Sequence, residues 1–204
     1  MTASDLLRSI GEPEIVRWLD HPTVTGLASG ELPRDDFVAW ARQDWIYLHH
    51  YVRVYASLAA VAPGPLVPEI VGMAHNLAAI ELGLLRDLSD GMGFVIDGAE
   101  PAAVTAEYME FLSSNMADFG LGLAAALPCL WGYTRLGLLL GVDDLSDDHP
   151  YAPWLKTYGG DPLRERVGRL LILLDAATPS PREVERLVRE AFVLEWRFWD
   201  VPSH

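Results

Sequence analysis

The sequence is poor in cysteine and in basic residues, and each shortage excludes a class of protein. A single cysteine among 204 residues cannot form an internal disulfide, so nothing indicates an oxidising compartment. Lysine and arginine together number 15 against 29 acidic residues, which gives a formal net charge of -14. Nucleic acids and anionic membranes are bound through clustered basic side chains, so we expect neither as a partner.

Signals for export and for membrane insertion are also missing. The first residues show no basic segment followed by an apolar one, as a signal peptide would. The longest apolar run, residues 119–133, is shorter than the ~20 residues that cross a bilayer, and Pro128 interrupts it. We therefore expect a cytoplasmic protein with a small-molecule ligand. Apolar residues are spread evenly without a linker or repeat, which favours a single domain over residues 1–204.

Motifs for phosphate, dinucleotide and metal binding are absent from the sequence. It has no Gly-x-Ser-x-Gly elbow, no glycine-rich phosphate loop and no dinucleotide fingerprint. Its histidines lack metal-ligand spacing, and no glutamate stands three residues before a histidine, as di-iron bundles usually require. We therefore expect neither a metal nor another cofactor. Among the histidines, His75 has the strongest claim to a place in a site.

Apolar residues recur at three- and four-residue steps, and this spacing predicts an all-α fold, a compact multi-helix bundle. The clearest helix opens after Pro33 and reaches about Pro63, because proline and acidic residues favour a first turn. The next is expected from Pro65 to about Gly91. Its predicted inner face consists of Ile70, Met73, Leu77, Ile80, Leu84 and Leu88.

The remaining helices are bounded by proline, glycine and capping residues. In residues 4–20 we expect two short helices, separated by Gly11 and Pro13. Ser180 and Glu183 have the spacing of a capping box, which predicts the start of the last helix. Other helices are expected over 23–29, 102–117, from Gly122 to 141, over 154–158 and over 161–175.

An aspartate lies on the inner face of the predicted helix between Pro33 and Pro63. Asp44 shares one stripe with Tyr47, Tyr51 and Tyr55, and apolar neighbours flank that stripe. A carboxylate facing a core is costly unless it is paired or hydrogen-bonded. Asp44 therefore either binds a ligand or is satisfied inside the protein. Candidate internal partners are a tyrosine hydroxyl, Arg42 and Arg53.

Two further candidates are Glu195 and Cys129. Glu195 shares an apolar helix face with Phe198, and such surroundings raise a carboxyl pKa toward the value that a general acid/base needs near neutral pH. Cys129 is either an inert core residue or a nucleophile. If Pro128 begins a helical segment, the helix N-terminus lowers the pKa of the thiol. If Pro128 bends a continuous helix, that effect is lost.

These residues belong to five segments that follow one another along the chain. The segments are Phe37-x5-Gln43-Asp44-x2-Tyr47-Leu48, Tyr108, Leu127-Pro128-Cys129-x3-Tyr133, Trp154-x3-Tyr158 and Leu194-Glu195-x2-Phe198-Trp199. In this order they resemble the TenA family, the thiaminase II or aminopyrimidine aminohydrolase proteins, over nearly the whole chain. The resemblance implies a heme-oxygenase-like helical fold without heme, assembled as a homotetramer.

The resemblance also implies an activity. The family converts 4-amino-5-aminomethyl-2-methylpyrimidine, or thiamine, to hydroxymethylpyrimidine in thiamine salvage or degradation. Cys129 matches the family's nucleophile, Glu195 its general acid/base, and Asp44 the carboxylate that binds the ring nitrogen and amino group. The matching pocket walls are Tyr47, Tyr108, Tyr133, Tyr158 and Phe198.

Two other functions are open for the same fold. One is a pyrimidine-binding or regulatory protein without turnover, which would need neither the thiol of Cys129 nor the acid of Glu195. The other is an iron-dependent oxygenase, which the missing Glu-x-x-His spacing disfavours.

Overall fold

The computed structural model describes residues 1–146 and 148–201, and the regular elements within them are all helical. The predicted all-α fold is confirmed. Short turns precede α4 at Gly64–Leu66, join α4 to α5 at Leu77–Glu81 (η2) and follow α7 at Val142–Asp144. The helices are α1 (Ala3–Trp18), α2 (Pro22–Ser29), α3 (Arg34–Val61), α4 (Val67–Asn76), α5 (Leu82–Met92), α6 (Ala103–Ser114), α7 (Phe119–Leu139), α8 (Ala152–Gly159), α9 (Asp161–Ala177) and α10 (Pro181–Trp199).

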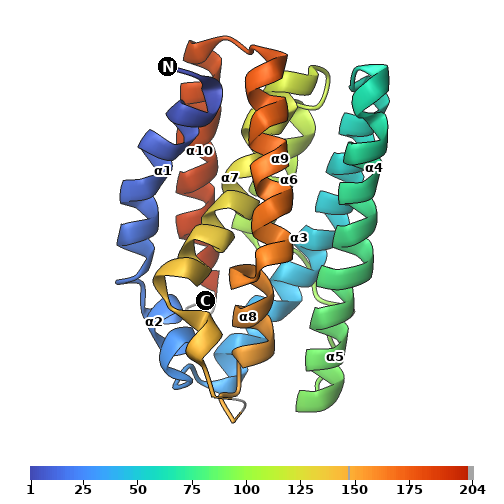
Figure 1. Ribbon diagram of the computed structural model, residues 1–204. Helices are drawn as coiled ribbons and strands as arrows, with labels where there is room; N and C mark the ends of the chain where they lie inside the picture. The colour runs from blue at the N-terminus through green and yellow to red at the C-terminus, as the bar shows by residue number, and fades with distance from the viewer. Residues whose placement is uncertain (147, 202–204) are drawn as a thin grey trace.

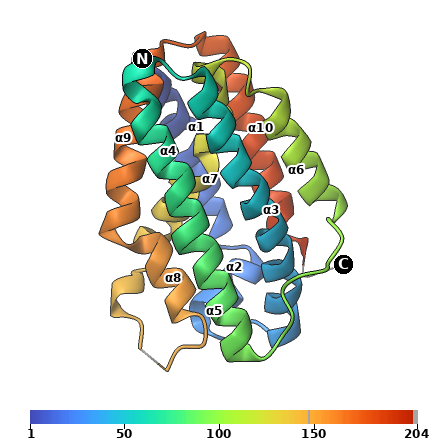
Figure 2. The ribbon, with the colours of Figure 1, turned by 90° about the vertical axis from the view of Figure 1, so that its right-hand side faces the viewer.

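The long helices form a bundle around α7 (Figure 1). In this view α1 and α10 lie on one side and α4 and α5 on the other, while α2 and α8 lie at the lower end. Figure 2 shows α3 between α4 and α6. Because α7 contacts α1, α8, α9 and α10, nearly all of its residues are buried.

Glycines let the helix backbones approach closely beside α7. A Cβ atom on Gly137 would lie 2.6 Å from the Cα atom of Gly159, so α7 and α8 meet backbone to backbone. A Cβ atom on Gly159 would collide with Val142 in the same way. This contact fixes the end of α8 against α7, where Tyr158 precedes Gly159.

The expectation of two short helices in residues 4–20 is wrong, because α1 is continuous through Pro13. Proline inside a helix removes one hydrogen bond and costs about 3 kcal/mol, which the burial of this helix offsets. Gly11 is a packing position rather than a break, since a Cβ atom there would lie 2.3 Å from the Trp131 ring and 2.7 Å from the Phe192 ring. The predicted capping box is also wrong, because Ser180 makes no side-chain cap hydrogen bond.

The helix that contains Cys129 is continuous through Pro128, which settles the alternative that the sequence left open. It begins at Phe119, before the expected Gly122, and Asp118 caps it by accepting a hydrogen bond from the Leu121 amide at 2.8 Å. Pro128 therefore lies inside the helix and not in its first turn. The N-terminus of the helix is too far away to lower the pKa of the Cys129 thiol.

The turn between α4 and α5 is a π-helix over Leu77–Glu81, in which the Leu82 amide donates to the Leu77 carbonyl. A π-turn adds one residue to a helix and rotates the helical segment after it. The predicted inner face is therefore wrong at Ile80 and Leu84, whereas Leu88 is buried as expected. Ile80 is 42 % exposed and Leu84 is half-buried, whereas Glu81, Leu82 and Leu85 are buried.

None of the helices in the described ranges combines the length and the apolar composition needed to cross a membrane.

Candidate active site

One pocket inside the bundle brings together every site residue predicted from the sequence. These residues come from five helices: α3, α6, α7, α8 and α10. Sequence reasoning had not assigned two further lining residues, Glu81 and Leu48. The pocket is lined by Asp44, Tyr47, Leu48, Glu81, Tyr108, Cys129, Tyr133, Tyr158, Glu195 and Phe198.

Asp44 is buried without a partner for one of its oxygens. Its side chain is 5 % exposed, and Oδ2 makes no hydrogen bond. Two of the candidate partners lie elsewhere, since Arg42 donates to the Val95 carbonyl and Arg53 to the His49 carbonyl. Burial, and then the charges of Glu81 and Glu195, raise the pKa of Asp44 well above its usual range. The protonated form of Asp44 is therefore favoured more than it would be for a carboxyl in water.

Glu195, by contrast, has a hydrogen-bond donor for one of its oxygens. Tyr108 Oη donates to Oε1 of Glu195 at 2.7 Å. Burial raises the pKa of Glu195 to about 7, and interactions with the side chains of Tyr108, Cys129 and Tyr133 oppose this rise. Its side chain is 1 % exposed. Near neutral pH this carboxyl can therefore either take up or give up a proton.

Cys129 is a neutral thiol in this pocket. Burial, followed by the nearby charge of Glu195, raises its pKa well above the usual range, and the Tyr47 hydroxyl opposes this only in part. Its side chain is 7 % exposed. One turn earlier, Tyr51 Oη donates to the Ala126 carbonyl at 2.7 Å and ties α7 to α3. The thiol can act as a nucleophile only if its proton has somewhere to go.

Aromatic rings form the walls around these groups. The rings of Tyr47 and Tyr108 lie 4.9 Å apart between centroids, and those of Tyr47 and Phe198 lie 5.8 Å apart. Tyr133 and Tyr158 face each other at 5.2 Å. The Tyr47 hydroxyl has no hydrogen-bond partner of acceptable geometry. Aromatic walls with unpaired polar groups suit a flat, polar ring.

Glu81 enters the pocket from η2, at the end of the π-turn. It is 4 % exposed and accepts a hydrogen bond from Tyr158 Oη at 2.9 Å. Burial raises its pKa to about 7, against the hydrogen bond from Tyr158 and the charge of Arg166. The sequence signal for Glu81 was its spacing, since it lies four residues after Leu77 and eleven after Ile70, on the face that these two residues share.

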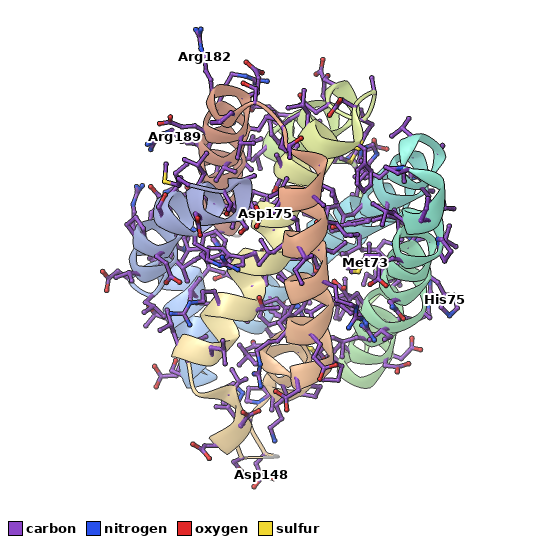
Figure 3. The ribbon with its side chains drawn as sticks, turned by 45° about the horizontal axis from the view of Figure 1, so that its top comes forward. Met73, His75, Asp148, Asp175, Arg182 and Arg189 are labelled. Carbon is purple, nitrogen blue, oxygen red and sulfur yellow. The ribbon has the colours of Figure 1, made fainter. Side chains whose placement is uncertain are left out.

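His75 does not belong to the site. It is exposed on α4 and points away from the bundle, whereas Met73 on the same helix points inward (Figure 3). Among the described residues, no group of three or more histidine, cysteine, aspartate or glutamate side chains is placed to hold a metal ion.

The family follows from the sequence as a whole. A family model described as the TENA/THI-4/PQQC family matches residues 7–203. The chain belongs to this family. As a TENA/THI-4/PQQC protein it has the expected heme-oxygenase-like fold, which it shares with a protein from Shewanella denitrificans described by that fold (TM-score 0.76, 14 % identity, 100 % of this chain and 92 % of the other).

Individual members of the TENA/THI-4/PQQC family are similar over most of the chain. An aminopyrimidine aminohydrolase of Halalkalibacterium halodurans is 30 % identical over 196 residues, which cover 89 % of this chain and 87 % of that protein. A TenA homologue from P. horikoshii OT3 superimposes with a TM-score of 0.91 at 26 % identity, over 99 % of this chain and 98 % of the other.

Proposed function

We propose that this protein hydrolyses the bond between an aminopyrimidine's methylene carbon and its amine. The substrate would be 4-amino-5-aminomethyl-2-methylpyrimidine, with thiamine as a second candidate, and the product hydroxymethylpyrimidine. The observation that carries the proposal is the meeting of a thiol, an acid/base and an unpaired carboxyl, Cys129, Glu195 and Asp44, in one aromatic pocket. Membership of the family and the similarity to an aminopyrimidine aminohydrolase support it.

The raised pKa of Asp44 suits recognition of the ring. An aminopyrimidine offers a basic ring nitrogen next to an amino group, which a carboxyl can bind with two hydrogen bonds. Because the pKa of Asp44 is raised, the carboxyl brings a proton that it shares with the ring nitrogen, while its other oxygen accepts from the amino group. Protonation of the nitrogen makes the ring electrophilic.

The first chemical step forms a bond between sulfur and a ring carbon. Glu195 takes the thiol proton of Cys129 as the sulfur adds next to the carbon that carries the aminomethyl group, and the protonated ring nitrogen accepts the displaced electron pair. The ring electrons then form an exocyclic double bond to the methylene carbon. The carbon–nitrogen bond breaks with its electron pair on nitrogen, so the protonated amine leaves as neutral ammonia.

Water completes the reaction. It adds to the methylene carbon as hydroxide, and its second proton leaves with the ammonia. The ring then expels the thiolate, to which Glu195 returns the proton taken in the first step. A raised pKa on both groups suits this cycle, because Cys129 rests as a thiol and Glu195 titrates near neutral pH.

The test is to incubate the protein with the aminomethyl pyrimidine and with thiamine and to measure hydroxymethylpyrimidine. We expect turnover with at least the aminomethyl pyrimidine, and a loss of roughly 10³-fold or more in Cys129→Ser. His75→Ala is the matched control, since His75 is exposed and should leave turnover unchanged. Undiminished turnover in Cys129→Ser would refute the mechanism. Binding of the pyrimidine without turnover would favour the non-catalytic alternative.

The family resemblance further supports a cytoplasmic homotetramer. Sedimentation analysis of the purified protein tests the assembly, and a monomer at micromolar concentration would contradict it.

A further inference from the structure

The proposed reaction leaves one buried carboxyl of the pocket without a role. Asp44 is assigned to the ring and Glu195 to the thiol proton, but Glu81 lines the same space and is just as enclosed. Its hydrogen bond from Tyr158 occupies Oε2 and fixes the orientation of the carboxyl. Burying a carboxyl lowers the stability of the fold, and a role in ligand binding would explain why Glu81 is buried here.

The backbone is shaped to place Glu81 there. In the π-turn the Leu82 amide reaches back to the Leu77 carbonyl, one residue further than in an α-helix. As a result, both Glu81 and Leu82 turn inward, while Ile80 lies at the surface. Single π-turns recur at functional sites because they aim one side chain out of the regular helical pattern.

The charge of the pocket indicates what it binds. Its described lining contains three carboxyls, Asp44, Glu81 and Glu195, and no lysine, arginine or histidine. In addition, Asp44 Oδ2 and the Tyr47 hydroxyl are buried in it without partners. A ligand that brings hydrogen-bond donors and positive charge would satisfy these groups, whereas an anionic ligand such as a phosphate ester would be repelled.

Glu81 also stands where this pocket adjoins a second, more open hollow. That hollow lies between η2 and the region from α8 to α9, and Glu81 belongs to the linings of both. Among the described residues that line the pocket, Glu81 alone also lines this hollow, so a leaving group held at Glu81 would lie beside it. The hollow is lined by Ile80, Glu81, Lys156, Thr157, Gly160, Pro162, Leu163 and Arg166.

We propose that Glu81 binds the protonated amine of the substrate and thereby selects pyrimidines that carry a cationic leaving group. This inference rests on the proposed function, since it gives each of the three carboxyls a separate role toward the same substrate. Asp44 holds the ring, Glu195 moves the proton of Cys129, and Glu81 holds the substrate's ammonium group, which leaves as ammonia when the carbon–nitrogen bond breaks. Glu81 is then a specificity-determining residue.

The test measures binding, so that it does not depend on turnover. In a Cys129→Ser background, calorimetry compares two ligands that share a ring and differ only in the 5-substituent, aminomethyl or hydroxymethyl. We expect the aminomethyl compound to bind at least 10-fold more tightly. Adding Glu81→Gln should remove that preference by weakening the aminomethyl compound alone. Glutamine keeps an oxygen that can accept the Tyr158 hydrogen bond, so the fold should be preserved.

Glu69→Gln is the matched control, because Glu69 lies on the preceding helix and pairs at the surface with Arg169. It should leave both affinities unchanged. Equal weakening of the two ligands by Glu81→Gln, no weakening, or no binding of either compound to the parent protein would overturn the inference. The outcomes separate the two proposals. Turnover in the wild type with an unaffected preference in Glu81→Gln removes only the role of Glu81, whereas an altered preference without wild-type turnover removes only the hydrolysis.

Discussion

Two adjoining regions of the interior, the pocket and a tryptophan cluster, share the helices α3, α8 and α10, on which they lie one turn apart. The cluster consists of Trp18, Trp40, Trp154 and Trp199, which are all fully buried. Trp40 precedes Asp44 by four residues on α3, Trp154 precedes Tyr158 on α8, and Trp199 follows Glu195 on α10. Each of these three tryptophans therefore stands next to a pocket residue on the same helix face.

The two regions differ in how their polar groups respond to conditions. The four indole N–H groups of the cluster lack hydrogen-bond partners, as do Asp44 Oδ2 and the Tyr47 hydroxyl in the pocket. An indole does not ionise. The cost of burying its unpaired N–H group is outweighed by ring packing, such as that of Trp40 and Trp199, whose stacked rings lie 5.6 Å apart between centroids. The carboxyls of the pocket change charge with pH and with ligand. The stability contributed by the cluster therefore does not depend on pH, whereas the charge of the pocket depends on pH and on the bound ligand.

The largest effect on stability is expected in the cluster. Trp199→Ala removes a fully buried ring that contacts Trp18, Trp40 and Tyr133, and should lower the free energy of unfolding by about 3–5 kcal/mol. Denaturant unfolding measures the loss. Trp196→Ala is the control, because that ring is only half-buried and packs on Arg17 and His21. A smaller loss for Trp199→Ala than for Trp196→Ala would contradict the distinction between the cluster and its surroundings.

A pH-dependent effect is expected in the pocket. The pKa of Glu195 is 4.5 in an unfolded chain and about 7 in the fold. The native state thus binds the proton more tightly, so the stabilisation is complete below pH 4.5 and disappears as the pH rises through 7. Glu195 alone should cost roughly 3 kcal/mol of unfolding free energy over that window.

The measurement compares wild type with Glu195→Gln by denaturant unfolding at several pH values. The substitution should make the stability less dependent on pH between about 4.5 and 7. Glu107→Gln serves as control, since Glu107 is exposed, pairs with Arg197 and has a lowered pKa. An identical pH dependence in wild type and Glu195→Gln would show that the carboxyl is not held in its neutral form.

The smallest effects are expected for two tyrosine hydroxyls of the pocket. Tyr108→Phe removes the donor to Glu195 and should destabilise the protein by about 1–3 kcal/mol. Tyr47→Phe removes a hydroxyl that has no partner and should change stability by less than about 1 kcal/mol. Thermal unfolding of the two variants without ligand checks the difference. A reversed order would indicate that the unpaired hydroxyl is satisfied in solution.

Helical periodicity was sufficient to predict the inward direction of Asp44 and Glu195. Each lies on a regular helix whose apolar neighbours mark the buried side, so the direction follows from spacing alone. Cys129 lies on α7, which is buried on nearly all sides, so spacing left its role open. That the three directions meet in one pocket depends on how α3, α7 and α10 pack, and it was anticipated through resemblance. Spacing left the partner of Asp44 open, and two of the candidates, Arg42 and Arg53, bond to carbonyls outside the pocket.

Where backbone geometry departs from the regular helix, the sequence was insufficient. Leu84 was wrongly placed on the inner face because periodicity assumes a constant rotation per residue, which the π-turn changes. Glu81 was missed for another reason: it has the spacing of the inner face, eleven residues after Ile70, but the apolar Ile80 beside it was chosen instead. Pro128 was ambiguous because a proline is compatible with both a first turn and an interior, and packing around α7 decided between them. Gly11 was misread as a break because its role depends on two rings, Trp131 and Phe192, that are distant in the sequence.

The π-turn is a single extra residue within Leu77–Glu81, absorbed without a loop. Ile70 and Met73 before it, and Leu82 and Leu85 after it, all face the core, although these four positions do not fit one regular α-helix. Loss of one residue within this segment would bring the two pairs into regular helical spacing, so both would keep their contacts with the core. Such a deletion would preserve the packing of α4 and α5 and would alter only the backbone around Glu81.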